Sequence, residues 1–468
     1  MKYLAILKDS LREAWDSWVL LGLLALSSLV ILFAAQLSFK PQTAEKTMRY
    51  FFAQNMFQQP VMTEALNSRK PEKILGMRGN WSRFRLEKVE LTRGEPDSPL
   101  SDYALIVAAD GRGFGMGGNF IVPAIEVQGK GPVEKKKPVV DTKADIAQLR
   151  TLFEDAEEIG YIKIDAIEPI ADDDGKGVPR YRVNLLSTPN TYRIWGTEPG
   201  VLFGLFTHEF FEIFAEPLGW RMYKLAQYII AVGSWIAVLF GIVITSFFIP
   251  NMLRKGTIDL LLVKPISRWL LLTYKFLGGL TFIFLTTGYA IGGVWLVLGL
   301  RSGLWANGAL LLIPSITFFF AILYAVSTFV GVVTRSVVAS ILLTIGAWVA
   351  FFGIGMVYRG IDLLEKLEKV EADRKEVDGQ QPKLAEERWA GGWTFTTIKV
   401  IHAISPRTED LNQLNDLIVY TDFMTGNLGN MNKFDNSNRS WWDSLLVSCI
   451  WIGIFLGLAS AWFYWKDY

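Results

Sequence analysis

The sequence predicts a mainly α-helical, polytopic membrane protein with six transmembrane helices and an α+β extracytoplasmic domain inserted between helices 1 and 2. Three observations support this fold class. Hydrophobic residues make up 51% of the 468 residues, which include 17 Trp. Six segments are apolar over the length that a bilayer requires. Between the first two of them lies a long stretch in which short apolar runs alternate with turn-forming residues.

Each of the six expected spans contains the roughly 20 apolar residues that cross a bilayer core. Five carry no charged side chain, and the third carries one, Lys275, within two turns of its predicted cytoplasmic end. We expect this long side chain to extend to the lipid headgroups, although a charge on a substrate pathway is the alternative interpretation. The spans are predicted at residues 18–37, 225–249, 269–300, 309–333, 337–358 and 445–464.

Lysine and arginine residues set the predicted orientation, because short cytoplasmic loops carry an excess of them. A cytoplasmic N-terminus leaves only Arg301 in the short outer loop after the third span. Both termini then lie in the cytoplasm, and residues 38–222 and 359–442 lie outside a bacterial cytoplasmic (inner) membrane. The basic residues on the predicted inner side are Lys2, Lys8, Arg12, Arg254, Lys255, Lys264, Arg268, Arg335 and Lys466.

The two outer segments differ in pattern. Residues 38–222 predict a mostly antiparallel α+β domain that begins with a helix at 45–58. In residues 359–442, apolar positions at helical spacing within the charge-rich stretch 361–388 predict a helix that extends the fifth span and is ended by Gly379 and Pro382. A second helix is predicted at 408–418. The strand-like runs of the first segment are residues 86–91, 103–108, 120–127, 161–167 and 181–186.

Composition argues against several classes of protein. A net charge of +1 gives no signature of nucleic-acid binding. One cysteine, Cys449, excludes an intramolecular disulfide, and two distant histidines, His208 and His402, argue against a histidine-rich metal site or a Ser-His-Asp hydrolase. The HExxE pattern at 208–212 is interpreted as an aromatic-faced interfacial helix and the acidic run at 172–174 as a turn, with metal binding as the alternative in each case. We expect no cofactor and no metal on this chain.

The predicted cytoplasmic loop at residues 250–268 is the strongest indication of function. Thr257 can cap a new helix with Asp259 in its first turn, and Lys264-Pro265 ends the apolar run that follows. One interpretation is a re-entry helix that only turns the chain. The other is a docking helix for a cytoplasmic partner, with basic residues around an apolar wedge. The candidate site consists of Arg254, Lys255, Gly256, Thr257, Ile258, Asp259, Leu260, Lys264, Pro265 and Arg268.

These residues carry a resemblance to a known family. The loop and the start of the third span resemble the permease subunits of ABC-2 type ATP-binding cassette transporters, in particular the branch of the nitrous-oxide-reductase maturation and gliding-motility permeases. Residues 1–17, which include Arg12 and Glu13, resemble the amphipathic elbow helix of that family. The matching runs are Gly256-Thr257-Ile258-Asp259-Leu260-Leu261-Leu262, Lys264-Pro265-Ile266-Ser267-Arg268 and Tyr274-Lys275-Phe276-Leu277-Gly278-Gly279.

The resemblance implies a transporter membrane subunit that is not itself an enzyme. The loop at 250–268 would be the coupling helix, which seats in a groove of a cytoplasmic ABC ATPase and transmits ATP-driven closure to the spans. The sequence contains neither a GxxxxGK[ST] run nor an LSGGQ-like run, so ATP and Mg²⁺ would be bound by that separate chain. The family plan further implies a homodimer or heterodimer of permeases in the lipid bilayer.

Two departures from the family pattern bear on function. The position before Gly256-Thr257 is often acidic in relatives but is Arg254-Lys255 here, and the outer domain is larger than in minimal exporters. Export of a molecule and mechanical work on an extracytoplasmic partner are both open. A membrane scaffold or sensor without an ATPase is the alternative from another class, and a membrane-embedded enzyme would need polar groups that the spans mostly lack.

Overall fold

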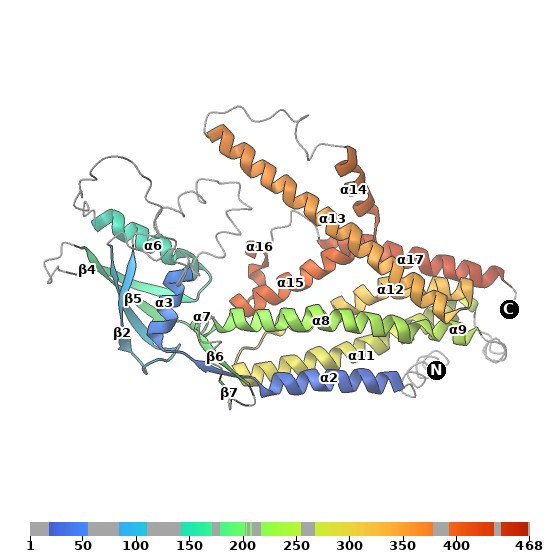
Figure 1. The fold of residues 1–468 in the computed structure, drawn as a ribbon, viewed down its shortest axis with the longest axis horizontal. Coiled ribbons are helices and arrows are strands. Elements are labelled where there is room, and N and C mark those ends of the chain that lie inside the picture. Colours follow the sequence, from blue (N-terminus) through green and yellow to red (C-terminus); the bar gives the residue numbers. More distant parts are fainter. Residues whose placement is uncertain are drawn as a thin grey trace.

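The computed structural model places a helical bundle beside a β-sheet domain that lies at one end of it (Figure 1). Helix α2 (Trp18–Gln36) begins, and helix α17 (Trp441–Trp465) ends, at the end of the bundle opposite this domain. The structure describes residues 18–54, 84–109, 142–170, 178–201, 203, 206–207, 217–253, 267–377, 393–434 and 441–466.

The larger sheet has four antiparallel strands in the order β2-β3-β5-β4. Its inner strand β3 is buried on both faces, with Leu105 and Val107 fully buried on one face and Ala104 and Ala108 on the other. The strands predicted at 86–91, 103–108, 161–167 and 181–186 are confirmed, whereas 120–127 lies outside the described residues. The four observed strands are β2 (Arg85–Arg93), β3 (Asp102–Ala108), β4 (Ile162–Ile170) and β5 (Arg180–Ser187).

Helix α6 (Thr142–Glu158) packs on this sheet and was not predicted from the sequence. Its buried side chains Leu149, Leu152, Phe153 and Ala156 follow the i, i+3, i+4, i+7 spacing of an amphipathic helix, so the pattern was present. The Tyr181 hydroxyl on β5 donates a 2.7 Å hydrogen bond to the fully buried Asp145 carboxylate, which fixes α6 against the sheet.

A second, three-stranded sheet forms the neck between the domain and the bundle. Strand β1 (Ser38–Pro41) starts two residues after α2 ends and pairs with β6 (Thr197–Val201), which pairs with β7 (Phe206–Thr207). Helix α3 (Ala44–Gln54) follows and confirms the helix predicted from residue 45, while residues 55–58 lie outside the described residues. The short α7 (Thr191–Ile194) lies between β5 and β6 and reaches the bundle.

Four described stretches are long and apolar enough to cross a membrane, namely Arg268–Ser302, Asn307–Thr334, Val337–Asp362 and Trp441–Trp465. Shorter apolar helical stretches, Leu20–Gln36 and Leu239–Met252, overlap the other two predicted spans. The six-span plan as a whole stays a prediction. The helices that contain these stretches are α2, α8 (Leu218–Ser246), α9 (Phe248–Met252), α11 (Arg268–Ser302), η4 (Asn307–Leu311), α12 (Leu312–Thr334), α13 (Val337–Val377) and α17.

Helix α12 is the centre of the bundle and packs against α8, α11, α13 and α17. The run from Phe319 to Thr328 is buried on every side, which explains why this helix is apolar around its whole circumference. Serine hydroxyls link it to its neighbours, with Ser327 Oγ 3.0 Å from Ser246 Oγ on α8 and 2.9 Å from Ser340 Oγ on α13. Such interhelical hydrogen bonds are typical of helices that pack without a hydrophobic driving force.

Helix α13 continues well past its apolar part, over 41 residues, which confirms that a helix extends the expected fifth span. It leans away from the rest of the bundle (Figure 1). The helix predicted at 408–418 is observed as α15 (Thr408–Thr425), which extends nearly two turns beyond the predicted C-terminus. Helix α14 (Trp393–Ile404), the single turns η7 (Leu428–Asn430) and α16 (Met431–Phe434), and the start of α17 complete this part.

Candidate functional site

Of the candidate site residues in the predicted coupling loop, Arg268 is the one that the structure describes. It is the first residue of α11. The structure gives no test of the other assignments, because they lie outside the described residues: Arg254, Lys255, Gly256, Thr257, Ile258, Asp259, Leu260, Lys264 and Pro265 in the loop, and Arg12 and Glu13 in the expected elbow helix.

Both described ends of the loop rest on one apolar cluster, which we call the inner cluster. The chain enters the loop after α9 at Leu253 and leaves it into α11, where Leu271 and Leu272 are almost fully buried. The same cluster includes residues from the ends of α12 and α17. Its buried members are Ile249, Met252, Leu253, Leu271, Leu272, Val332, Ala459 and Phe463.

Arg268 joins the start of α11 to the last turn of α17. Its Nη1 atom donates to the carbonyl oxygens of Phe463 at 3.2 Å, Tyr464 at 3.5 Å and Lys466 at 3.2 Å. The last carbonyls of a helix have no partner within the helix and carry partial negative charge, so a guanidinium is well suited to them. The described contacts of Arg268 thus lie within the chain, and its contact with a partner stays a prediction.

Lys275 on α11 does not extend to the lipid headgroups as expected. Only 2% of the residue is exposed, so its side chain lies inside the protein. The neighbouring Phe276 stacks on Tyr324 of α12, with ring centroids 4.9 Å apart, and Gly279 allows this close approach because a Cβ there would meet the Tyr324 ring. The prediction failed because it considered the bilayer and not the neighbouring helices.

At the other end of the bundle, α7 inserts two side chains among the ends of bundle helices. The hydroxyl of Tyr192 donates to the Ser302 carbonyl at the end of α11, at 2.8 Å. The Nη1 atom of Arg193 donates to the carbonyls of Asp422 at 2.8 Å and Phe423 at 3.0 Å, near the end of α15. We call these five residues the outer junction.

The outer junction is completed by the carboxylate of Asp422, which accepts a 2.5 Å hydrogen bond from the Gly308 backbone N–H in η4. Burial lowers the pKa of Arg193, and the nearby Asp422 charge partly offsets this. Burial likewise raises the pKa of Asp422, against the Gly308 hydrogen bond and the Arg193 charge. The positive charge of Arg193 and the negative charge of Asp422 therefore partly offset each other's cost of burial.

The neck makes further backbone connections to the same end of the bundle. The Trp195 carbonyl accepts from the N–H of Leu218, the first residue of α8, while the Trp195 indole N–H donates to the Gln42 carbonyl within the neck at 2.9 Å. Arg301 near the end of α11 donates to the Leu37 carbonyl at 2.8 Å. The sheet domain is thus hydrogen-bonded to the ends of α8, α11 and α15, not only linked to them through the chain.

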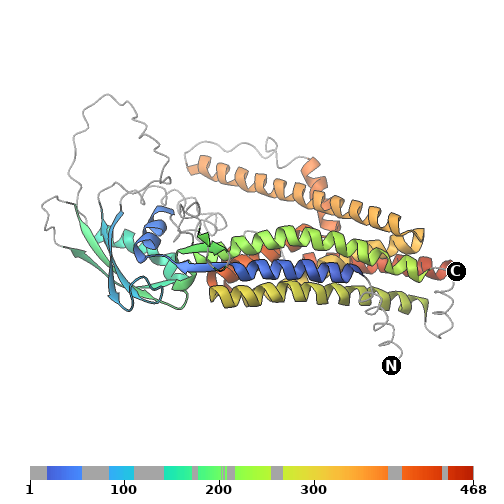
Figure 2. The ribbon, with the colours of Figure 1, turned by 60° about the horizontal axis from the view of Figure 1, so that its bottom comes forward.

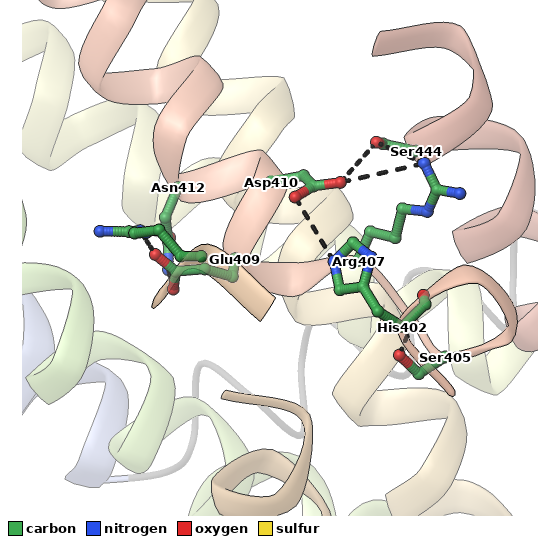
Figure 3. A network of polar contacts seen from close by, with 8 residues as sticks. His402, Ser405, Arg407, Glu409, Asp410, Asn412 and Ser444 are labelled. Atoms are coloured by element: carbon green, nitrogen blue, oxygen red, sulfur yellow. Dashed lines mark hydrogen bonds and ion pairs between the residues drawn. The ribbon is translucent and has the colours of Figure 1, made fainter. Parts of the chain in front are cut away.

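A third polar cluster joins α13, α14, α15 and α17 (Figure 3). The Asp410 carboxylate accepts a 2.9 Å hydrogen bond from Ser444 and lies 3.7 Å from the His402 Nε2 atom and 4.0 Å from Arg407. The His402 ring stacks on Tyr358 with centroids 3.8 Å apart. Beside this cluster, Arg359 on α13 forms an ion pair with Glu409, which is paired with Asn412 as well.

This cluster is not arranged as a hydrolytic triad. In a triad the histidine lies between the serine and the acid and removes the serine proton. Here Ser444 donates to Asp410 directly, so the carboxylate lies between the other two groups. Within the described residues, no group of three or more His, Cys, Asp and Glu side chains is placed to hold a metal ion. His208 and the acidic run at 172–174 lie outside those residues.

Neither the outer junction nor the Asp410 cluster was found from the sequence. Their partners lie far apart along the chain, with Arg193 and Asp422 separated by 229 residues. No local spacing marks such a pair. The sequence itself offers only charged and hydroxyl side chains near predicted helix ends, which do not identify their partners.

A comparison with protein families assigns the chain to one family. The family model described as ABC-2 family transporter protein matches residues 4–468. The chain belongs to this family. The match supports the sequence-based resemblance and makes the chain a permease component of a transporter and a multi-pass membrane protein. No curated protein and no solved structure is significantly similar to it.

Proposed function

We propose that this ABC-2 family protein is the membrane-spanning permease subunit of a bacterial inner-membrane transporter, driven by a separate cytoplasmic ABC ATPase. In this proposal the chain crosses the membrane six times with both termini inside, and two permeases form a homodimer or heterodimer. The expected basic inner side and the sheet domain lie at opposite ends of the bundle, which supports this topology (Figure 1).

The observation that carries the proposal is the seating of the loop at 250–268. Its two described ends rest on the inner cluster, to which α9, α11, α12 and α17 all contribute. A partner that pushes on the loop would therefore act on the ends of all four helices. ATP and Mg²⁺ would be bound by the partner chain, whose closure supplies the movement.

The outer junction favours mechanical transmission as the output of this movement. Arg193 and Tyr192 hold the ends of α15 and α11 by hydrogen bonds that are partly buried. Because directional hydrogen bonds shielded from water resist sliding, a tilt of these helices would carry the sheet domain with it. This connection would allow the helices to do mechanical work on an extracytoplasmic partner. The resemblance to the gliding-motility branch suggests the same role.

Copurification tests the ATPase partner. We expect the detergent-solubilised chain to recover a cytosolic protein with Walker and signature motifs, at about one ATPase per permease. Replacing Arg254 and Lys255 with Glu should abolish this recovery, because the two positive charges border the proposed docking helix. Arg335→Glu is the matched control, a charge reversal at an exposed residue on the same predicted side but outside the loop. Recovery of envelope proteins with no ATPase would indicate a scaffold or sensor instead.

Cysteine labelling tests the topology. Leu100 precedes β3 and is 66% exposed, whereas the adjacent Ser101 is only 4% exposed, so Leu100→Cys offers an accessible thiol. The background should be Cys449→Ser, because Cys449 is exposed as well. We expect an impermeant maleimide to label this variant in intact spheroplasts. Labelling that requires lysis would place the sheet domain in the cytoplasm and reverse the orientation.

A further inference from the structure

A cavity of about 550 Å³ lies among α2, α8, α11 and α12, in the half of the bundle nearer the sheet domain. Figures 1 and 2 both show α2, α8 and α11 running side by side to the right of that domain. The volume is within the range of sites that bind small molecules. Phe423, whose carbonyl accepts from Arg193, is the one outer-junction residue in its lining, and no residue of the inner cluster lines it.

The cavity is closed on one side and open on the other. Its floor is formed by buried residues such as Leu298, Leu312 and Phe423. Its rim includes Leu29 on α2, which is 64% exposed, and Tyr228 on α8, which is 71% exposed. Helix α2 packs on α11, whereas α8 packs mainly on α12 and α15, and the opening lies between the exposed faces of α2 and α8.

The cavity extends along the helix axes. Its lining on α2 runs from Leu23 to Phe33, and its lining on α11 runs from Thr287 to Leu298. At 1.5 Å per residue, each stretch covers roughly 15 Å. This is about half of the ~30 Å hydrocarbon core of a bilayer, and therefore about the depth of the acyl chains in one leaflet.

The lining is suited to a hydrocarbon and not to a polar ligand. None of the residues that line it is charged. The hydroxyl of Thr287 already donates a 2.8 Å hydrogen bond to the Ile283 carbonyl of its own helix. A polar ligand would lose hydrogen bonds on entering and find few replacements, whereas an acyl chain has none to lose.

Positive charges lie beside the end of the cavity that faces the sheet domain. Lys224 immediately precedes the lining residue Leu225, and the exposed Arg301 follows Leu298 by three residues. Basic residues at the membrane interface attract phosphate groups of lipids. An apolar cavity of one-leaflet depth that ends next to basic residues matches the two parts of a phospholipid.

We propose that this cavity binds an acyl chain of a phospholipid, which enters sideways between α2 and α8. The assignment to the outer leaflet rests on the proposed topology, but lipid binding itself does not depend on the ATPase. A cavity occupant at this place would set the separation of α2 and α8. The competing occupant is a second copy of the chain.

Photo-crosslinking tests the proposal. The full chain is reconstituted in nanodiscs that contain a phospholipid with a diazirine on its acyl chain, and adducts are mapped by mass spectrometry. We expect adducts on α2 and on residues 287–298 of α11 to exceed, several-fold, those on the exposed face of α13 around Leu342. Equal labelling of the two regions would mean ordinary contact with bulk lipid and would overturn the proposal.

Cavity-filling variants sharpen the test. Ala290→Phe on α11 and Ala226→Phe on α8 each place a ring in the cavity from a different wall and should reduce the adducts on α2 several-fold. Leu342→Phe is the control, because Leu342 is 64% exposed on α13. Two filling variants are used so that failure of one to fold leaves the other, and unchanged adducts in a folded filling variant would overturn the proposal.

Disulfide trapping tests whether a second copy of the chain, and not a lipid, fills the opening of the cavity. Leu29→Cys in a Cys449→Ser background places a thiol at the exposed rim of the cavity. If lipid fills the opening, the wild-type adducts on α2 persist and this variant stays uncrosslinked under oxidation. A disulfide-linked dimer together with missing adducts on α2 would assign the opening to a second copy and reject the lipid.

Discussion

The two ends of the helix bundle are held by different kinds of contact. At the sheet-domain end, Tyr192 and Arg193 hydrogen-bond to the carbonyls that end α11 and α15, and the Asp422 carboxylate holds η4. At the opposite end, the described helix ends meet mainly through the side chains of the inner cluster, with Arg268 as a polar addition on α17.

This difference has a mechanical consequence. Buried hydrogen bonds fix direction and are costly to break, whereas apolar contacts allow small shifts at little cost as long as the surfaces stay in contact. At the inner cluster, which is proposed to receive the ATPase movement, the helix ends can therefore shift against one another. At the outer junction, which is proposed to deliver the movement, the helix ends are fixed to the sheet domain.

The largest effect is expected from Arg193→Ala. The change leaves two helix-end carbonyls and the Asp422 carboxylate without their cation in a largely buried site, and it should cost about 3 kcal/mol of stability. Denaturant unfolding of the purified protein in detergent measures this. The control is Arg182→Ala, which removes a surface ion pair with Glu90 and should cost less than about 1 kcal/mol. Similar losses in the two variants would mean that the outer junction does not fix the domain.

A smaller effect is expected from Gly426→Ala. Gly426 ends α15 with φ +68°, and a Cβ there would meet the Arg193 guanidinium. The left-handed backbone and this contact together should cost about 2 kcal/mol. Gly453→Ala on α17 is the control, since a Cβ at that position has nothing within 4 Å. If both variants unfold at the same denaturant concentration, the close packing of Arg193 on this helix end is not important for stability.

The smallest effect on stability is expected from Arg268→Ala. Its hydrogen bonds are 3.2 to 3.5 Å long and the residue is only half-buried, so about 1 kcal/mol should be lost. If the inner end transmits movement from the loop, stimulation of the partner ATPase should nevertheless fall, and Arg268→Lys should restore only part of it because lysine lacks the planar fork. A stability loss as large as that of Arg193→Ala would remove the contrast between the two ends.

Local patterns predicted much of the secondary structure. Alternating apolar residues located the strands β2, β3, β4 and β5, and helical spacing located α15 and the extension of α13. The amphipathic pattern of α6 was present in the sequence but was missed. The candidate loop rested on short motifs, and the family match to residues 4–468 supports the identification that they suggested.

The sequence by itself determined that this is a membrane protein of the ABC-2 family with apolar helices and a strand-rich insertion, because hydropathy and residue spacing are properties of neighbouring residues. Only the tertiary structure decided that Lys275 is buried, that Arg268 binds the end of α17, and that Arg193 reaches α15. These contacts join residues up to 230 positions apart, and a side chain's environment is set by the helices that pack around it, which no local pattern encodes.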